Sequence, residues 1–225
     1  MEERGGSVEA AVIRSLVFDV GETLIDETRI WSRWADRLGV PCLTFMGVLG
    51  GMAALDRSHA DAFQVIRPGL DLDAEIEAWR RDDPYSLREN FDGDDLYPDV
   101  RDSLAVLRSA GYELIIAGNQ PSQAYDALVA MDLPVDAIHT SAAWEVEKPA
   151  PEFFAKVAAV AGRRPEEILY VGDRLDNDVL PAKRAGMRTA LLRRGPWGYL
   201  HAARPEAAEA GVVVDSLADL VAHLV

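Results

Sequence analysis

The sequence predicts an α/β fold in which a parallel sheet forms the core and an all-helical cap domain is inserted into it. The first observation is a set of short apolar runs bounded by turn residues, at residues 16–20, 113–117, 168–172 and 189–192. Helix-like segments separate these runs, and this alternation is typical of parallel strands joined by crossover helices. The second observation is a long segment without a comparable strand pattern, in which apolar residues recur at helical spacing. Together they indicate a Rossmann-like core with a helical insertion.

The boundaries of the insertion follow from turn residues and from the place where the strand pattern is interrupted. The acidic segment at residues 92–99, DGDDLYPD, is dense in turn formers, and a helical pattern resumes directly after it. We therefore expect residues 27–97 to form the helical insertion, and residues 1–26 together with residues 98–225 to form the core. A chain of 225 residues is long enough for both.

The charge of the chain excludes some partners. It has 38 acidic and 23 basic side chains, a formal net charge of −15. This charge repels nucleic acid and anionic membrane surfaces at long range, so neither is an expected partner. A small phosphorylated ligand remains compatible, because backbone amides, a lysine and a metal ion can reverse the sign of the local potential. The expected partner is a small-molecule substrate, and the sequence leaves the oligomeric state open.

Three features bear on location. The single cysteine, Cys42, excludes an internal disulfide and favours a reducing compartment, so we expect a cytoplasmic protein. Residues 1–11 carry acids and glycines instead of a basic segment followed by an apolar core, so we expect no signal peptide there. The uncharged stretch at residues 39–55 is too short and too broken by proline and glycine for a membrane span, and we expect a buried helix.

Polar residues follow the predicted strands where a ligand would bind. Asp19 follows the first strand, Asn119 the second, and Asp173 the strand at residues 168–172, while Lys148 lies in a loop before that strand. In parallel sheets, ligands bind outside the carboxyl ends of the strands. A carboxylate there can attack phosphorus to give an acyl phosphate, with a divalent ion and a lysine neutralising negative charge.

Four segments carry a resemblance to a known family. In chain order they are LVFDVGETL at residues 16–24, IIAGN at 115–119, EKPAPEFF at 147–154 and YVGDRLDNDVLPAKRAGM at 170–187. In this order and spacing they resemble the four motifs of the haloacid dehalogenase (HAD) superfamily, in the members with a helical cap. The lysine-proline motif followed by GDxxxxD is the most specific part.

The resemblance implies roles for the residues at these positions. Asp19 would be the nucleophile, Thr23 would support its loop, and Lys148 would steady the phosphoaspartate. Asn119 and Gly118 would lie against the transferring group as substrate-binding residues.

The resemblance also implies a Mg²⁺ site. Asp19, the backbone carbonyl of Gly21 and Asp173 would hold the ion, with help from Asp178, and water molecules would complete its octahedron.

Two residues depart from the family pattern. Gly21 stands where phosphatases of the family have a second aspartate, which protonates the leaving oxygen and later activates water. Glu22 or Asp26 could replace that acid if the loop bends differently, although a shift of one residue ordinarily turns a side chain elsewhere. Gly118 stands where the family has Ser or Thr, so a hydroxyl donor to phosphate is missing.

The missing aspartate leaves other classes open. Phosphonatases of the family use a cap lysine, but the lysines here all lie outside residues 27–97, at Lys148, Lys156 and Lys183. Dehalogenases work without metal and carry an arginine near the first motif, a role Arg29 could fill, although a solvated charge on a cap helix is the favoured interpretation. Asp173 after Gly172 favours a metal site instead.

The sequence therefore predicts a Mg²⁺-dependent phosphatase that acts on a small phosphorylated metabolite through a phospho-Asp19 intermediate. The alternatives are a metal-independent 2-haloacid dehalogenase-like hydrolase and a catalytically degenerate protein with a binding role. Outside these motifs, we expect Trp197 and Tyr199 to lie in a loop after a core strand. We expect His59 to lie on a solvated face of the cap, with contact to substrate as the alternative.

Overall fold

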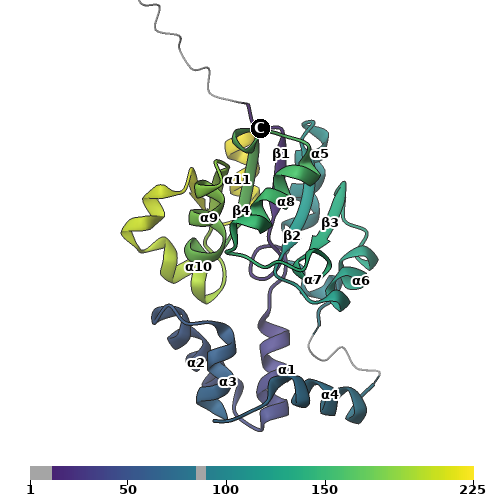
Figure 1. Cartoon of the computed structure of the whole chain (residues 1–225), viewed down its shortest axis with the longest axis vertical. Coiled ribbons are helices and arrows are strands. Elements are labelled where there is room, and N and C mark those ends of the chain that lie inside the picture. The colour runs from purple at the N-terminus through teal and green to yellow at the C-terminus, as the bar shows by residue number, and fades with distance from the viewer. Residues whose placement is uncertain (1–11, 85–89) are drawn as a thin grey trace, which may run out of the picture.

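The computed structural model describes residues 12–84 and 90–225 (Figure 1). The predicted lack of a signal peptide concerns residues 1–11, which lie outside the described residues.

The centre of the molecule is one parallel sheet with the strand order β3-β2-β1-β4-β5-β6. The strands are β1 (Ser15–Phe18), β2 (Glu113–Gly118), β3 (Ala137–Thr140), β4 (Ile168–Gly172), β5 (Arg188–Leu192) and β6 (Val212–Val214). Each of the four predicted strands is present. The two edge strands, β3 and β6, were not predicted, because each has at most four residues and too short an apolar run to stand out. The predicted α/β, Rossmann-like fold class is confirmed.

Helices cover both faces of this sheet, because side chains alternate between its faces along each strand. Leu16 and Phe18 face a cluster that includes Leu104 and Leu217, whereas Val17 faces the opposite cluster, which includes Phe154. The core helices are α5 (Val100–Ser109), α6 (Ser122–Ala130), α7 (Ser141–Trp144), α8 (Pro151–Ala161), α9 (Leu180–Arg184), α10 (Gly195–Ala202) and α11 (Leu217–Leu224). Shorter helical turns are η1 (Gly93–Asp95), η2 (Pro165–Glu167), η3 (Leu175–Val179) and η4 (Pro205–Glu209).

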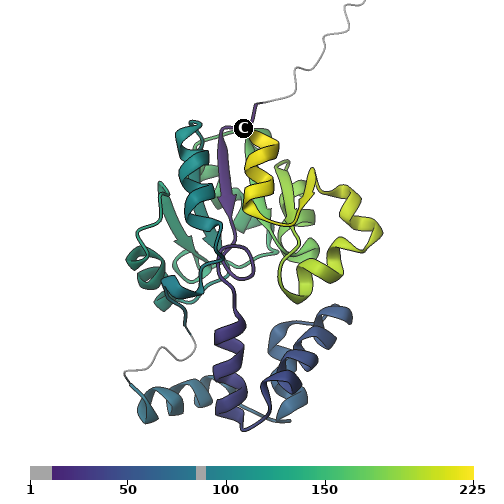
Figure 2. The same cartoon turned by 180° about the vertical axis from the view of Figure 1, so that it is seen from behind.

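Four further helices lie beyond the carboxyl ends of the strands, at the lower end of Figures 1 and 2. They are α1 (Thr28–Leu38), α2 (Cys42–Ala54), α3 (His59–Ile66) and α4 (Leu72–Asp82). Aromatic side chains pack between them: the ring centroid of Trp34 lies 4.8 Å from that of Phe63 and 4.9 Å from that of Trp79, both edge to face. This aromatic cluster gives the helices an apolar core of their own.

The predicted buried helix at residues 39–55 is α2, but only one of its faces is buried. Phe45 and Leu49 are buried, whereas Leu43 is 85% exposed. Within the described residues, no single helix is long and apolar enough to cross a bilayer; only the bent pair α1 and α2, at 115° to each other, meets the length and composition criteria together.

Two backbone segments connect these helices to the sheet and lie side by side. Asp26 donates its backbone N–H to the carbonyl of Asp95 (2.8 Å), and Tyr97 donates to the carbonyl of Leu24 (3.0 Å). Arg29 of α1 reinforces the pairing, with Nε and Nη2 donating to the buried Asp95 carboxylate at 2.6 and 2.5 Å. Arg29 is therefore an ion-paired anchor on α1, and because its side chain is still 39% exposed, the prediction of a solvated charge holds only in part.

Candidate active site

Strand ends bring the predicted reactive side chains into one cluster. The Lys148 ammonium lies 2.7 Å from Asp19 Oδ1 and 2.6 Å from Asp178 Oδ1. These three side chains are at most 10% exposed. Asp173, directly after β4, is also buried and lies close enough to Asp19 and Asp178 for the three carboxylates to share one cation. Because β1 lies between β2 and β4, their carboxyl ends meet here.

Two glycines make room for this cluster. A Cβ atom on Gly118 would lie 2.4 Å from Asp19 Oδ1, and one on Gly172 would lie 2.4 Å from Asp178 Cγ. The absence of a side chain at Gly118, at the end of β2, therefore makes room for the carboxylate of Asp19. The Ser or Thr of the family pattern could not stand here without displacing Asp19.

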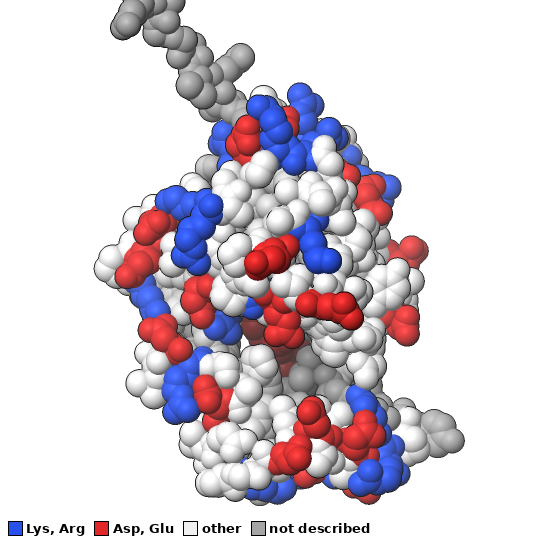
Figure 3. All heavy atoms as spheres, viewed as in Figure 1, with Lys and Arg blue, Asp and Glu red and all other residues white. Residues whose placement is uncertain are grey.

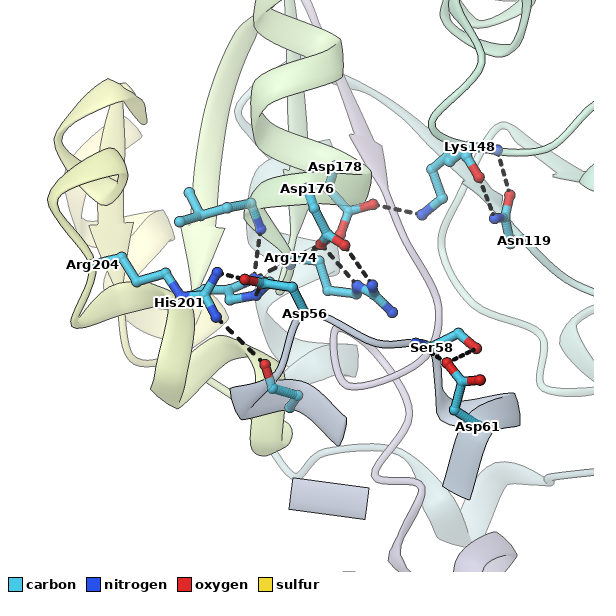
Figure 4. Close-up of polar contacts among 12 residues, drawn as sticks. Asp56, Ser58, Asp61, Asn119, Lys148, Arg174, Asp176, Asp178, His201 and Arg204 are labelled. Carbon is cyan, nitrogen blue, oxygen red and sulfur yellow. Dashed lines mark hydrogen bonds and ion pairs between the residues drawn. The ribbon is translucent and has the colours of Figure 1, made fainter. Parts of the chain in front are cut away.

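Asn119 holds the lysine loop. Its side-chain Nδ2 donates to the Lys148 carbonyl (2.9 Å), and its Oδ1 accepts the Lys148 backbone N–H (2.7 Å), as Figure 4 shows. Both polar atoms of the amide are thus engaged by the Lys148 backbone. Asn119 also lines the cavity, and its contact with the transferring group stays a prediction.

Thr23 is fully buried in the loop that follows Asp19. Its backbone N–H donates to the Val20 carbonyl (3.3 Å), and its own carbonyl accepts from Arg194 (2.8 Å). Its hydroxyl has no hydrogen-bond partner among the described residues. Thr23 therefore supports the loop through its backbone.

The acidic residues offer ligands for a divalent cation. Asp19, Asp173 and Asp178 each have a carboxylate oxygen within 4.8 Å of those of the other two. Burial, together with the charges of Asp178, Asp19 and Glu22, holds the pKa of Asp173 well above its usual range. A bound Mg²⁺ would relieve this repulsion, so the donor set fits the ion.

Asp178 has a second role that the sequence did not indicate. Its Oδ1 accepts from Lys148 (2.6 Å) and its Oδ2 accepts the backbone N–H of Arg174 (3.0 Å), so both oxygens are engaged (Figure 4). Burial raises the pKa of Asp178 to about 6, against the lowering effect of Lys148. In this geometry Asp178 orients the lysine, and direct ligation of a metal would require it to give up one of these contacts.

The place beside Gly21 is filled by Glu27, a residue that belongs to none of the four motifs. A Cβ atom on Gly21 would lie only 2.4 Å from Glu27 Oε1. The Glu27 side chain is half-buried and lines the cavity, and burial, with the charges of Glu22 and Asp19, raises its pKa to about 8. Five residues lie between Gly21 and Glu27 in the sequence, so only the path of the loop brings them together.

Glu22 and Asp26, the two acids that the sequence suggested as replacements, do not occupy the space beside Gly21. The Glu22 carboxylate accepts from the Tyr97 hydroxyl and from the Glu27 backbone N–H (3.1 Å). Asp26 Oδ1 accepts the backbone N–H of Thr28 (2.9 Å) at the start of α1. Both carboxylates are therefore engaged by the local backbone or by the Tyr97 hydroxyl.

A cavity of about 300 Å³ opens onto the cluster between the core and the four helices. In Figure 3 this region is a hollow with acidic side chains around it. Ser58, His59 and Trp31 line it from the helical side, and Arg174 and Trp197 from the core. A larger cavity of about 550 Å³ lies elsewhere, and its lining includes none of the strand-end acids.

His59 is an exposed residue that also lines this cavity, with its ring centroid 5.7 Å from that of Trp31, and burial lowers its pKa. The expectation of a loop after the core strand is wrong. Residues 195–202 form helix α10 instead of a loop. Trp197 is buried in that helix, with the Arg174 guanidinium 4.9 Å above its ring, whereas Tyr199 is 65% exposed.

The parallel sheet, with an acidic, lysine-containing cleft at its carboxyl ends, defines an α/β protein of the Rossmann-like class. Residues 13–186 match the family model of the haloacid dehalogenase-like hydrolases, so the chain belongs to that family of hydrolases. The predicted HAD-family hydrolase is thereby confirmed.

Among curated relatives, a phosphoglycolate phosphatase of Vibrio vulnificus is 28% identical over 222 residues, covering 93% of this chain and 95% of that protein. A glyceraldehyde 3-phosphate phosphatase of Methanopyrus kandleri is 38% identical over 104 residues, covering 45% of each chain. The match therefore spans about half the length of the Methanopyrus protein.

Solved structures share the fold. A HAD-hydrolase, YfnB from Bacillus subtilis, bound to magnesium, superposes with a TM-score of 0.69 at 20% identity, covering 95% of this chain and 99% of that one. A dehalogenase superposes with a TM-score of 0.68 at 22% identity, covering 94% and 97%. At these identities the likeness shows the fold alone.

Proposed function

We propose that the protein is a Mg²⁺-dependent phosphatase of small phosphorylated metabolites. The observation that carries the proposal is the buried cluster in which Lys148 lies between Asp19 and Asp178, beside Asp173. Dehalogenation without metal would not need the repulsive third carboxylate of Asp173. The phosphatases among the relatives are named for esters of two or three carbons, and a cavity of about 300 Å³ suits a substrate of that size.

The geometry supports a two-step displacement. An Asp19 carboxylate oxygen attacks phosphorus, the bond from phosphorus to the leaving oxygen breaks, and an aspartyl phosphate forms. Water then attacks phosphorus and releases phosphate, restoring the Asp19 carboxylate. Lys148, oriented by Asp178, offsets negative charge on the nucleophile and the phosphoryl oxygens. Asp19, Asp173 and the Gly21 carbonyl would hold Mg²⁺, which supplies further charge neutralisation when bound.

The test is release of phosphate from phosphoglycolate, glyceraldehyde 3-phosphate and p-nitrophenyl phosphate, with Mg²⁺ and with a chelator. We expect release that needs Mg²⁺ and that the matched variant Asp19→Asn abolishes, because the amide is a poor nucleophile. Phosphate release that persists in Asp19→Asn, or that is indifferent to chelator, would rule the proposal out.

A metal-independent 2-haloacid dehalogenase remains the second candidate, because structures of dehalogenases share the fold. The arginine considered for halide binding does not support it, since Arg29 pairs with Asp92 and Asp95 and does not line the cavity that contains Asp19. Chloride release from 2-chloropropionate in the presence of a chelator would favour this candidate. A protein silent on every substrate that still binds phosphate or Mg²⁺ would instead have a binding role.

We also propose that residues 27–97 act as the cap that admits and encloses the substrate. In support, side chains from α1 and from the start of α3 line the cavity opposite the acidic cluster. A cytoplasmic location stays a prediction from the single cysteine.

A further inference from the structure

The second acid of a phosphatase site is missing from the loop after Asp19, yet a carboxyl group occupies its place. A Cβ atom built on Gly21 would lie 2.4 Å from Glu27 Oε1 and 2.9 Å from Glu27 Cδ. An aspartate at this position would therefore have to enter the space that the Glu27 carboxyl group already fills. This carboxyl group comes from a different point of the chain, one residue before α1.

The Glu27 carboxyl group is held in that orientation by defined contacts. Trp31 Nε1 donates to Glu27 Oε2 at 3.1 Å, one turn along α1. The backbone N–H of Glu27 donates to Glu22 Oε1 at 3.1 Å. Oε2 is thus engaged by the indole, while Oε1 is the atom closest to Gly21. Glu27 lines the same cavity as Asp19 and Lys148.

Other acidic or titratable groups near the cavity are less suited to this role. Glu22 is bonded to the Tyr97 hydroxyl and to the Glu27 backbone, and Asp26 to the backbone at the start of α1. Glu147 and His59 line the cavity but keep much of their surface exposed, and neither occupies the space beside Gly21.

We propose that Glu27 is the general acid and base of this enzyme, replacing the aspartate that Gly21 cannot supply. The inference rests on the proposed phosphatase function. As Asp19 attacks phosphorus, the bond to the leaving ester oxygen breaks, and that oxygen takes the proton of the Glu27 carboxyl group and departs as an alcohol. The resulting Glu27 carboxylate then takes a proton from water, whose oxygen attacks phosphorus, so phosphate leaves and both acids return to their starting states.

This arrangement links the acid to the cap. Glu27 is the residue before α1 and its carboxyl group is bonded to Trp31 of that helix. Displacing α1 from the core would withdraw the acid from the space beside Gly21, so protonation of the leaving group depends on where the cap helix lies.

The test compares a substrate that needs a proton on its leaving group with one that does not. In Glu27→Gln, single-turnover cleavage of phosphoglycolate should fall about 10²–10⁴-fold, the usual contribution of a general acid. The first turnover of p-nitrophenyl phosphate should fall far less, because its leaving group is stable as an anion. A burst of about one equivalent of nitrophenol should follow, because the phosphoenzyme forms but no base activates water for its hydrolysis.

Two further variants separate catalysis from structure. Glu27→Ala empties the space beside Gly21. The double variant Glu27→Ala/Gly21→Asp should cleave phosphoglycolate at least about tenfold faster than Glu27→Ala alone, because an aspartate at position 21 supplies the missing acid. The matched control Asp26→Asn removes a neighbouring carboxylate that does not line the cavity, and it should keep the wild-type ratio of the two substrates. Circular dichroism and melting curves report whether each variant folds.

An equal loss on both substrates in a folded Glu27→Gln, or no loss on either, would overturn the inference while leaving the proposed function intact. Failure of Gly21→Asp to restore any activity to a folded Glu27→Ala would also overturn it. Absence of Mg²⁺-dependent phosphate release from the wild-type enzyme is a separate result, because it refutes the proposed function and the inference with it.

Discussion

Two glycines show how the absence of a side chain shapes this site. Gly21 leaves room for the Glu27 carboxyl group and Gly118 leaves room for Asp19 Oδ1, because a Cβ atom at either glycine would lie 2.4 Å from the neighbouring carboxylate oxygen. Compared with the family pattern, both glycines lack a functional side chain, an aspartate at Gly21 and a serine or threonine at Gly118. In the structure, each space is filled by a carboxylate that bears on the proposed chemistry.

Replacing Gly118 with the serine of the family pattern should therefore lower the activity. In Gly118→Ser the new Cβ would overlap Asp19 Oδ1 and press on Val20 Cγ2 at 3.3 Å. We expect phosphate release to fall about 10²-fold, since a displacement of about 1 Å in a reacting group costs that much. The matched variant Gly118→Ala, with the same Cβ and no hydroxyl, should lose as much. A rise in activity in Gly118→Ser alone would mean that the missing hydroxyl limits phosphate binding.

The raised pKa of the Glu27 carboxyl group should also make the stability of the folded protein depend on pH. Its pKa is raised to about 8 from an ordinary 4.5 by burial and by Glu22 and Asp19. Between these values the unfolded chain releases a proton that the folded protein keeps, so stability falls as pH rises from about 4.5 to about 8. At about 1.4 kcal/mol for each pKa unit, the full loss is at most a few kcal/mol.

The measurement is urea unfolding of metal-free wild type and Glu27→Gln at pH 5 and pH 8. The neutral amide does not titrate, so the variant should gain stability relative to wild type between the two values. Parallel pH curves for the two proteins would show that Glu27 is ionised throughout in the folded state.

At the scale of elements, the return segment before α5 depends on an anchor in α1. The Asp95 side chain is only 3% exposed and pairs with Arg29, which also reaches Asp92. The two backbone segments that connect the helices to the sheet meet beside this pair.

A second contact between the helices and the core, Arg204 to Asp56 at 2.5 Å, joins the end of α2 to the region after α10 (Figure 4).

Arg29→Ala should lower the free energy of unfolding by about 1–3 kcal/mol, because it leaves the buried Asp95 carboxylate without its charged donor. The measurement is a urea titration. The control is Arg57→Ala, whose pair with Asp61 is exposed (50% and 33%) and should contribute less than about 1 kcal/mol. Equal effects in the two variants would contradict the view that Asp95 is the buried anchor of this segment.

At the scale of the whole molecule, a net charge of −15 opposes the approach of an anionic substrate. Acidic and basic side chains are interspersed on the face seen in Figure 3, and the whole chain has an excess of acids. The buried Lys148 contacts Asp19 and Asp178 directly, and the Arg174 guanidinium is a second positive charge on the cavity wall.

The value of kcat/KM for phosphoglycolate should therefore rise when ionic strength is raised from about 0.01 M to 0.15 M, because the screening length shortens from about 30 Å to about 8 Å. The rise should be smaller for p-nitrophenyl phosphate, which lacks the additional carboxylate. A fall in kcat/KM with salt for both substrates would show that local positive charge near the cavity governs their encounter.

The sequence by itself determined the four inner strands of the sheet and the identity of the reactive cluster. Apolar runs such as residues 16–20 have the length and spacing of buried strands, and polar residues at the ends of parallel strands must meet at one edge, so Asp19, Lys148 and Asp173 could be grouped in advance. The edge strands could not be predicted, because β6 has three residues and only pairing with β5 makes it a strand.

Only the tertiary structure decided how the gaps in the motifs are filled. Glu27 reaches Gly21, Asn119 turns to the Lys148 backbone, and His59 faces the cavity because loops and helices distant in sequence fold against one another. Periodicity and motif spacing are local along the chain. Which carboxyl group occupies a given space depends instead on the path of the backbone and the packing around it, which no local pattern specifies.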